Sequence, residues 1–147
     1  MTVYALLKAL HIICAVIWVG GMFFAYVILR PSLGVLEPPN RLALHTQVFR
    51  RFFLIVWHAM PVIILSGFIM LFGYMGGMAG AGWTIHAMLT LGIIMAIVFV
   101  MIFFGPYRQF RNTEDRALKV AALDTIRKLI GLNLIIGLVT VAIAGLR

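Results

Sequence analysis

Charged residues are scarce in this chain, and cysteine is almost absent. Only 11% of the 147 residues are charged, whereas 64% are hydrophobic, and a soluble domain normally carries about a quarter of charged residues. The single cysteine, Cys14, excludes an intramolecular disulfide and any multi-cysteine zinc or iron–sulfur site. Nucleic-acid binding would explain the net charge of +8, but the basic residues lie in short clusters between long apolar runs rather than on one exposed face. The composition therefore predicts an integral membrane protein.

The lengths of the uncharged runs predict the number of spans. The run from Phe52 to Tyr107 has 56 residues without Asp, Glu, Lys or Arg, and one crossing needs about 20 residues. It is read as two spans separated by the glycine-rich segment Gly73–Gly82. The apolar stretch before Arg30 is longer than a signal-peptide core and has no small-x-small cleavage site, so it is interpreted as a retained span. We predict an all-α fold in one domain over residues 1–147, a four-transmembrane-helix bundle with helices at 4–29, 50–73, 83–106 and 125–146.

Basic residues predict the orientation of these helices. Ten of the twelve lie in or beside the first and third connections, and the second connection has none. They are Arg30, Arg41, Arg50 and Arg51 in the first, and Arg108, Arg111, Arg116, Lys119, Arg127 and Lys128 in the third. The positive-inside rule places both basic connections in the cytoplasm. Both termini and the glycine-rich segment are then predicted to be periplasmic.

This topology places two histidines at similar depths in the membrane. At a rise of 1.5 Å per residue, His11 lies roughly 10–12 Å inside the outer end of the first helix, and His86 lies roughly 5 Å inside that of the third. Ionisable groups inside a membrane usually have a function or a partner. Two imidazoles on facing helices are a common axial ligand pair for haem b. We therefore predict that His11 and His86 bind a haem iron near the outer leaflet.

Three neighbouring residues suit a haem site. Lys8 lies one turn before His11, where its ammonium can meet a haem propionate. Trp18 lies on the same helix face as His11 and can form a wall of the porphyrin pocket. Thr90 lies one turn after His86 and can orient that imidazole.

Other interpretations of the same residues stay open. His58 is an alternative haem ligand, or it serves the helix bend expected at Pro61. His45 is expected to be a solvated residue of the first cytoplasmic connection. His11 and His86 can also be simple interhelical hydrogen-bonding groups, and Asn133 is expected to join two helices in that way.

Methionines support a copper interpretation. Met70, Met75 and Met78 cluster near the outer end, and thioethers together with imidazole suit Cu(I). Their spacing lacks the density of a dedicated copper-binding tract, and methionine also fills gaps in apolar cores.

Three segments carry a resemblance to a known family: "LHIICAVIWVGGMFFAYVILRPSL", "FRRFFLIVWHAM" and "WTIHAML". Together they resemble the copper-resistance-D (CopD)-like family of small integral membrane proteins, over all four predicted spans. The likeness is strongest from His11 to Pro31, where His11, Trp18, Gly20 and Gly21 form an H-x6-W-x-G-G pattern. This resemblance implies copper handling in the periplasm or across a bacterial inner membrane.

The pattern is also similar to the HemJ-type protoporphyrinogen oxidases. That resemblance implies four or five spans, bound haem b and a histidine in the first helix comparable to His11. In those proteins a lysine occupies the third-helix position where this chain has His86. The difference argues against protoporphyrinogen oxidation and favours ligation of the haem by two histidines.

The leading functional prediction is a b-type haem protein of the inner membrane. Its role would be electron transfer, or a haem-dependent oxidation that involves a quinone or a small membrane substrate, with the reactivity supplied by the cofactor. The alternatives are copper handling across the membrane and a metal-free membrane assembly subunit. Membrane lipid surrounds such a protein, nucleic acid is not an expected partner, and a homo-oligomer is left open.

Overall fold

The computed structural model describes residues 1–147 and contains helices but no strand. Four helical segments are long and apolar enough to cross a membrane, and they cover Val3–Val35, Pro38–Tyr74, Trp83–Asn112 and Arg116–Gly145. The predicted all-α, four-span fold is confirmed. Many large apolar side chains are exposed on the outer faces, among them Leu54, Leu65 and Ile135, as expected for helices that face lipid rather than water.

The first and third segments are each composed of several elements. The first consists of α1 (Val3–Phe23), a π-helical turn over Phe24–Leu29, α2 (Arg30–Ser32) and a 3-10 turn over Leu33–Val35. The second is α3 (Pro38–Tyr74), which is followed by the short helix α4 (Gly77–Gly80). The third consists of α5 (Trp83–Phe104) and α6 (Pro106–Asn112), and the fourth is α7 (Arg116–Gly145).

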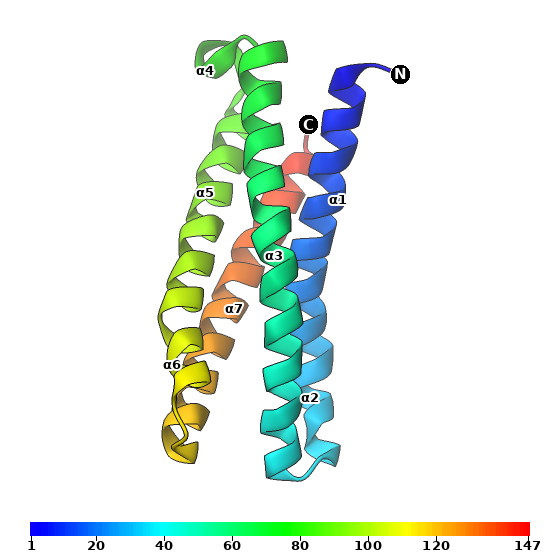
Figure 1. The fold of residues 1–147 in the computed structure, drawn as a ribbon. Coiled ribbons are helices and arrows are strands. Elements are labelled where there is room, and N and C mark those ends of the chain that lie inside the picture. The colour runs from blue at the N-terminus through cyan, green and yellow to red at the C-terminus, as the bar shows by residue number, and fades with distance from the viewer.

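The four long helices form a bundle of two tightly packed pairs. α1 packs mainly on α3 and α5 mainly on α7, while α1 also touches α7. Both chain termini and α4 lie at one end of the bundle, here called the terminal end, and α2 and α6 lie at the other, here called the basic end (Figure 1). An even number of crossings requires both termini to share one side. That this side is the periplasm stays a prediction.

Glycines let α7 approach the first helical segment closely. A Cβ atom added to Gly131 would lie 2.8 Å from the ring of Tyr26, and one added to Gly137 would lie 3.0 Å from Val19. Small residues allow this kind of close contact between membrane helices. Asn133 lies between these two glycines, and its side-chain amide donates to the backbone carbonyl of Met95 over 3.2 Å. The predicted interhelical role of Asn133 is confirmed.

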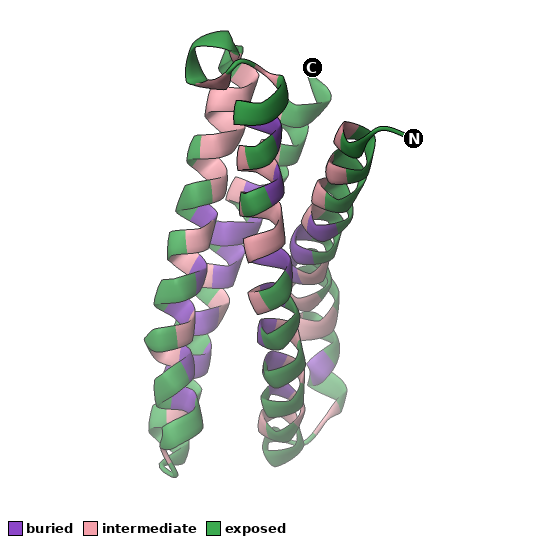
Figure 2. Cartoon of the chain, turned by 45° about the horizontal axis from the view of Figure 1, so that its top comes forward, coloured by how far each residue is buried: buried purple, intermediate pink, exposed green.

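The packed core is concentrated from the middle of the bundle to the basic end. Seventeen buried apolar residues form one cluster that begins at Trp18 on α1 and includes the aromatic side chains of Phe53, Phe99 and Tyr107. Phe53 and Tyr107 meet edge to face with ring centroids 4.4 Å apart. At the terminal end, α1 has no buried residue before Cys14, and α5 has none from Trp83 to Ile94. Figure 2 shows this change from purple to pink and green along the bundle.

The first and third helical segments end later than predicted, at Val35 and Asn112. Two helix starts also differ from the prediction, and one of them changes the place of a histidine. α3 begins at Pro38 rather than near residue 50, and α7 begins at Arg116 rather than near 125. The early turns of α3 are amphipathic, so an average of hydropathy misses them although their apolar face packs on the bundle. The expectation of a solvated His45 was therefore wrong. His45 is helical and buried, and its ring lies 5.3 Å from that of Phe49.

The glycine-rich segment makes the turn that was predicted between the second and third spans. Gly76 and Gly77 adopt φ values of 76° and 71°. Residues with a Cβ atom rarely adopt this left-handed backbone conformation, which explains the need for glycine at this turn.

Candidate functional site

His11 is held at the interface between α1 and α3. Its Nδ1 lies 2.9 Å from Ser66 Oγ, and the Ser66 hydroxyl itself donates to the carbonyl of Val62 over 2.6 Å. This hydroxyl has only one proton, so when that proton goes to Val62, Ser66 Oγ accepts the hydrogen bond from the Nδ1–H of His11. The neutral imidazole then keeps a free lone pair on Nε2, which is the form that binds a metal.

Gly67 provides the space for this imidazole. A Cβ atom at position 67 would lie 3.2 Å from His11 Cε1, closer than ordinary van der Waals contact. Ser66 therefore hydrogen-bonds the His11 imidazole, and Gly67 leaves the space that the ring occupies. Sequence reasoning found His11 but missed both partners, because they are more than fifty positions away along the chain and no local pattern connects them.

Two buried sulfur side chains lie on α1 and α3, on either side of the level of His11. Cys14 lies three residues after His11 on α1 and is a free, buried thiol. Met70 lies one turn after Ser66 on α3 and is 7% exposed. The antiparallel register places Met70 between two cross-helix contacts, His11 to Ser66 and Tyr4 to Tyr74, whose ring centroids are 5.2 Å apart. Met70 thus lies about one turn from His11 toward the terminal end, and Cys14 lies about one turn from it toward the basic end, so the two sulfur side chains are about two turns apart along the helices.

The other proposed haem contacts lie on different helices or faces. His86 lies in the first turn of α5 and is half-buried, whereas Lys8 and Thr90 are exposed. Lys8 is free to extend toward the membrane surface, and Thr90 makes no side-chain hydrogen bond to His86. Trp18 is buried and meets Phe99 edge to face with ring centroids 6.2 Å apart. This contact joins α1 to α5 about two helical turns from His11, in the direction of the basic end.

His58 and the remaining methionines lie away from His11. His58 is exposed on α3 and its Nδ1 bonds to the carbonyl of Leu54 over 2.8 Å, one turn back on the same helix. Met75 ends α3 and Met78 lies on α4, where its side chain is exposed. No group of three His, Cys, Asp or Glu side chains forms a ready-made metal site.

The family of the chain follows from a comparison with known protein families. The model of the family described as "Copper resistance protein D" matches residues 46–147. The chain belongs to the CopD family. No curated protein and no solved structure matches it.

Membership of the CopD family identifies a multi-pass membrane protein related to copper resistance. The matched region contains His58, His86 and all of the three predicted copper-site methionines, but it begins after α1. The part of the resemblance from His11 to Pro31, and the similarity to the HemJ-type oxidases, stay predictions.

Proposed function

We propose that this CopD-family membrane protein binds Cu(I) at the α1–α3 interface and takes part in moving or buffering copper at the terminal end of the bundle. Family membership supports copper as the cargo. The single observation that carries the location is the hydrogen bond between His11 and Ser66, which leaves Nε2 free. Buried sulfur side chains lie about one turn away on either side, Met70 toward the terminal end and Cys14 toward the basic end.

The chemistry of these side chains suits Cu(I) rather than a harder ion. Thioether, thiolate and imidazole are soft or borderline ligands, and Cu(I) accepts a small number of them. No carboxylate lies on α1 or on the outer half of α3, so Ca²⁺ and Mg²⁺ would find no suitable oxygen ligands. Binding through Cys14 requires loss of the thiol proton, so copper affinity should rise with pH.

A titration of Cu(I) against a chromophoric chelator tests this site. The protein is purified in detergent without oxygen, and we expect one Cu(I) per chain to be retained. His11→Ala, Cys14→Ser and Met70→Leu should each weaken binding. Ser66→Ala leaves all three ligands in place but frees the imidazole, and loss of such an orienting partner typically costs about 10–100-fold in metal affinity.

Matched controls lie on the same helices. His58→Ala removes an exposed imidazole of α3, and Met78→Leu removes an exposed thioether of α4. Both should bind Cu(I) like the unmodified protein. Full affinity in His11→Ala, or a loss in His58→Ala, would contradict the proposed location.

Haem b held by His11 and His86 is a second candidate, and one observation favours it. The two histidines come from the two different helix pairs, and the segment of α5 that carries His86 has no buried residue up to Ile94. An imidazole with a fixed tautomer and a free Nε2 also suits an axial ligand. Bound haem would supply one-electron transfer, for example with a quinone or a small membrane substrate.

An absorption spectrum of the purified protein distinguishes the two candidates. Two histidine ligands would give a low-spin spectrum with a sharp alpha band in the reduced state, and a pyridine haemochrome assay would identify haem b. His11→Ala and His86→Ala should then each disturb the spectrum, and His58→Ala should not. Stoichiometric copper without haem supports the first candidate, and neither ligand would favour a metal-free assembly subunit.

A further inference from the structure

A cavity lies far from His11, at the basic end. Its volume is about 780 Å³, and it lies between the π-helical turn that follows α1, the first turns of α3 and the first turns of α7. Four guanidinium groups and one imidazole line it, from Arg30, Arg41, Arg116, Arg127 and His45. No carboxylate lines it. The excess of positive charge therefore favours an anionic ligand.

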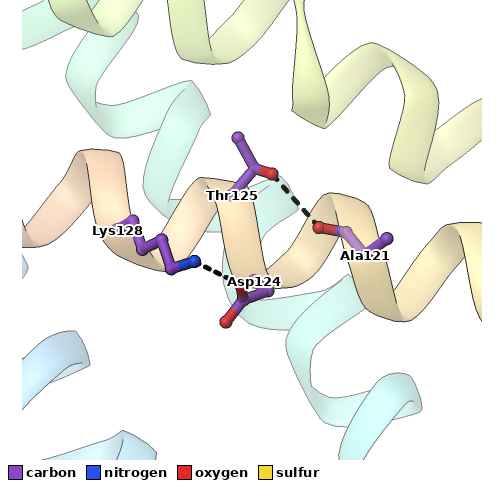
Figure 3. A network of polar contacts seen from close by, with 4 residues as sticks. All are labelled: Ala121, Asp124, Thr125 and Lys128. Carbon is purple, nitrogen blue, oxygen red and sulfur yellow. Dashed lines mark hydrogen bonds and ion pairs between the residues drawn. The ribbon is translucent and has the colours of Figure 1, made fainter.

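One nearby carboxylate, Asp124 of α7, interacts with Arg127 but is shared with Lys128, so the four guanidinium groups keep an excess of positive charge. Asp124 forms an ion pair with Lys128, 3.0 Å away on the same helix (Figure 3). The next polar contact in this view, from the Thr125 hydroxyl to the carbonyl of Ala121, also stays within α7. Arg127 has Arg30 as a like-charged neighbour. Its Nε is buried and has no hydrogen-bond acceptor, and a buried donor without a partner is unfavourable.

Two of the four guanidinium groups are held in position by the protein. Arg41 Nε donates to the carbonyl of Leu36 over 2.7 Å, and Arg30 lies over the ring of Tyr26 at 5.1 Å. Stacking on an aromatic ring leaves the N–H groups at the edge of the guanidinium available. Such groups match a phosphate better than a compact monovalent anion, because each can donate two parallel hydrogen bonds.

A local irregularity of the helix helps to form the cavity. Pro31 has no backbone N–H, and its ring displaces the carbonyl of the preceding turn. The helix widens here, and the Arg30 N–H bonds to the carbonyl of Ala25, five residues back. Single π-helical turns of this kind often occur at functional sites.

The walls of the cavity also contain apolar side chains. Val27, Leu33 and Leu42 line it together with the guanidinium groups. A site of this kind, at the charged ends of membrane helices, combines contacts for a phosphate with contacts for glycerol and acyl chains. We propose that this cavity binds the phosphate group of an anionic phospholipid. The same phosphate chemistry could come from inorganic phosphate, and the experiment below separates the two sources.

Native mass spectrometry of the detergent-purified protein, after incubation with phosphatidylglycerol or phosphatidylcholine, tests the proposal. We expect one phosphatidylglycerol to be retained in preference to phosphatidylcholine. Arg127→Gln should reduce the retained fraction at least fivefold, and Arg127→Lys, which keeps the charge but loses the planar fork, should reduce it partly. Arg108→Gln is the matched control, because Arg108 is an exposed arginine at the same end that does not line the cavity.

Three outcomes would overturn the proposal. One is equal retention of the two lipids, and another is an equal loss in Arg127→Gln and Arg108→Gln. In a second arm, millimolar inorganic phosphate is added, and displacement of the lipid by phosphate would show that the free anion is the ligand. Circular dichroism of each variant checks its helical fold, and Arg127→Lys preserves the test if Arg127→Gln does not fold.

Discussion

At the scale of single residues, Gly67 controls the position of the His11 ring. A valine at position 67 would place its Cβ 3.2 Å from His11 Cε1 and its methyl groups closer still, so the imidazole must turn away from Ser66. We predict that Gly67→Val breaks this hydrogen bond and weakens Cu(I) binding, measured by chelator competition, by about 10–100-fold as for loss of an orienting partner. Gly73→Val is the control, because a Cβ atom there meets nothing within 4 Å on the same helix. Equal effects of the two substitutions would mean that helix propensity, and not the imidazole, is responsible.

At the scale of helices, Asn133 joins α5 and α7 through one hydrogen bond but also buries an unpaired oxygen. Its Nδ2 donates to the carbonyl of Met95, whereas its Oδ1 has no partner. A polar contact between membrane helices contributes about 0.6 kcal/mol on average, and an unpaired buried polar atom costs about 1–3 kcal/mol. We predict that Asn133→Leu changes the free energy of unfolding in detergent by less than about 1 kcal/mol. Asn133→Ala, which leaves a cavity, should be destabilised more. A large loss in Asn133→Leu would show that the amide has a further partner.

At the scale of the whole molecule, the distribution of basic residues determines the side on which each end lies. Arg30, Arg41 and Arg116 all belong to the basic end, and the positive-inside rule directs that end to the cytoplasm. A reporter fused after Arg147 should therefore report the periplasm, and one inserted at Asn112 the cytoplasm. Alkaline phosphatase is active only in the periplasm and a fluorescent protein folds in the cytoplasm, so the two reporters check each other. The reverse pattern would place the lipid cavity in the outer leaflet and the Cu(I) site on the cytoplasmic side.

The helices were predictable from sequence because their signal is local. Twenty uncharged residues in a row can be counted, and the glycines near position 76 mark the turn directly. The amphipathic beginning of α3 could not be predicted in this way, because charged residues lie between its apolar ones. The burial of His45 follows only from the packing of the bundle. Contacts between segments that are distant along the chain could not be predicted either. His11 was a visible polar residue in an apolar helix, but Ser66 and Gly67 are recognised only when the register of α1 against α3 is known.

The three tryptophans lie in very different surroundings, so their intrinsic fluorescence can report on different parts of the protein. Trp18 is 3% exposed and is shielded by Phe99, whereas Trp83 is 65% exposed at the start of α5. Trp57 lies between these extremes and is surrounded by Phe99 and Phe103. Brominated lipids quench the fluorescence of indoles that they touch. They should therefore quench the fluorescence of Trp83 but not that of Trp18. The remaining fluorescence then comes from tryptophan in the aromatic core. Binding of Cu(I) or haem near His11 should then reduce this remaining tryptophan fluorescence, which the brominated lipid does not quench.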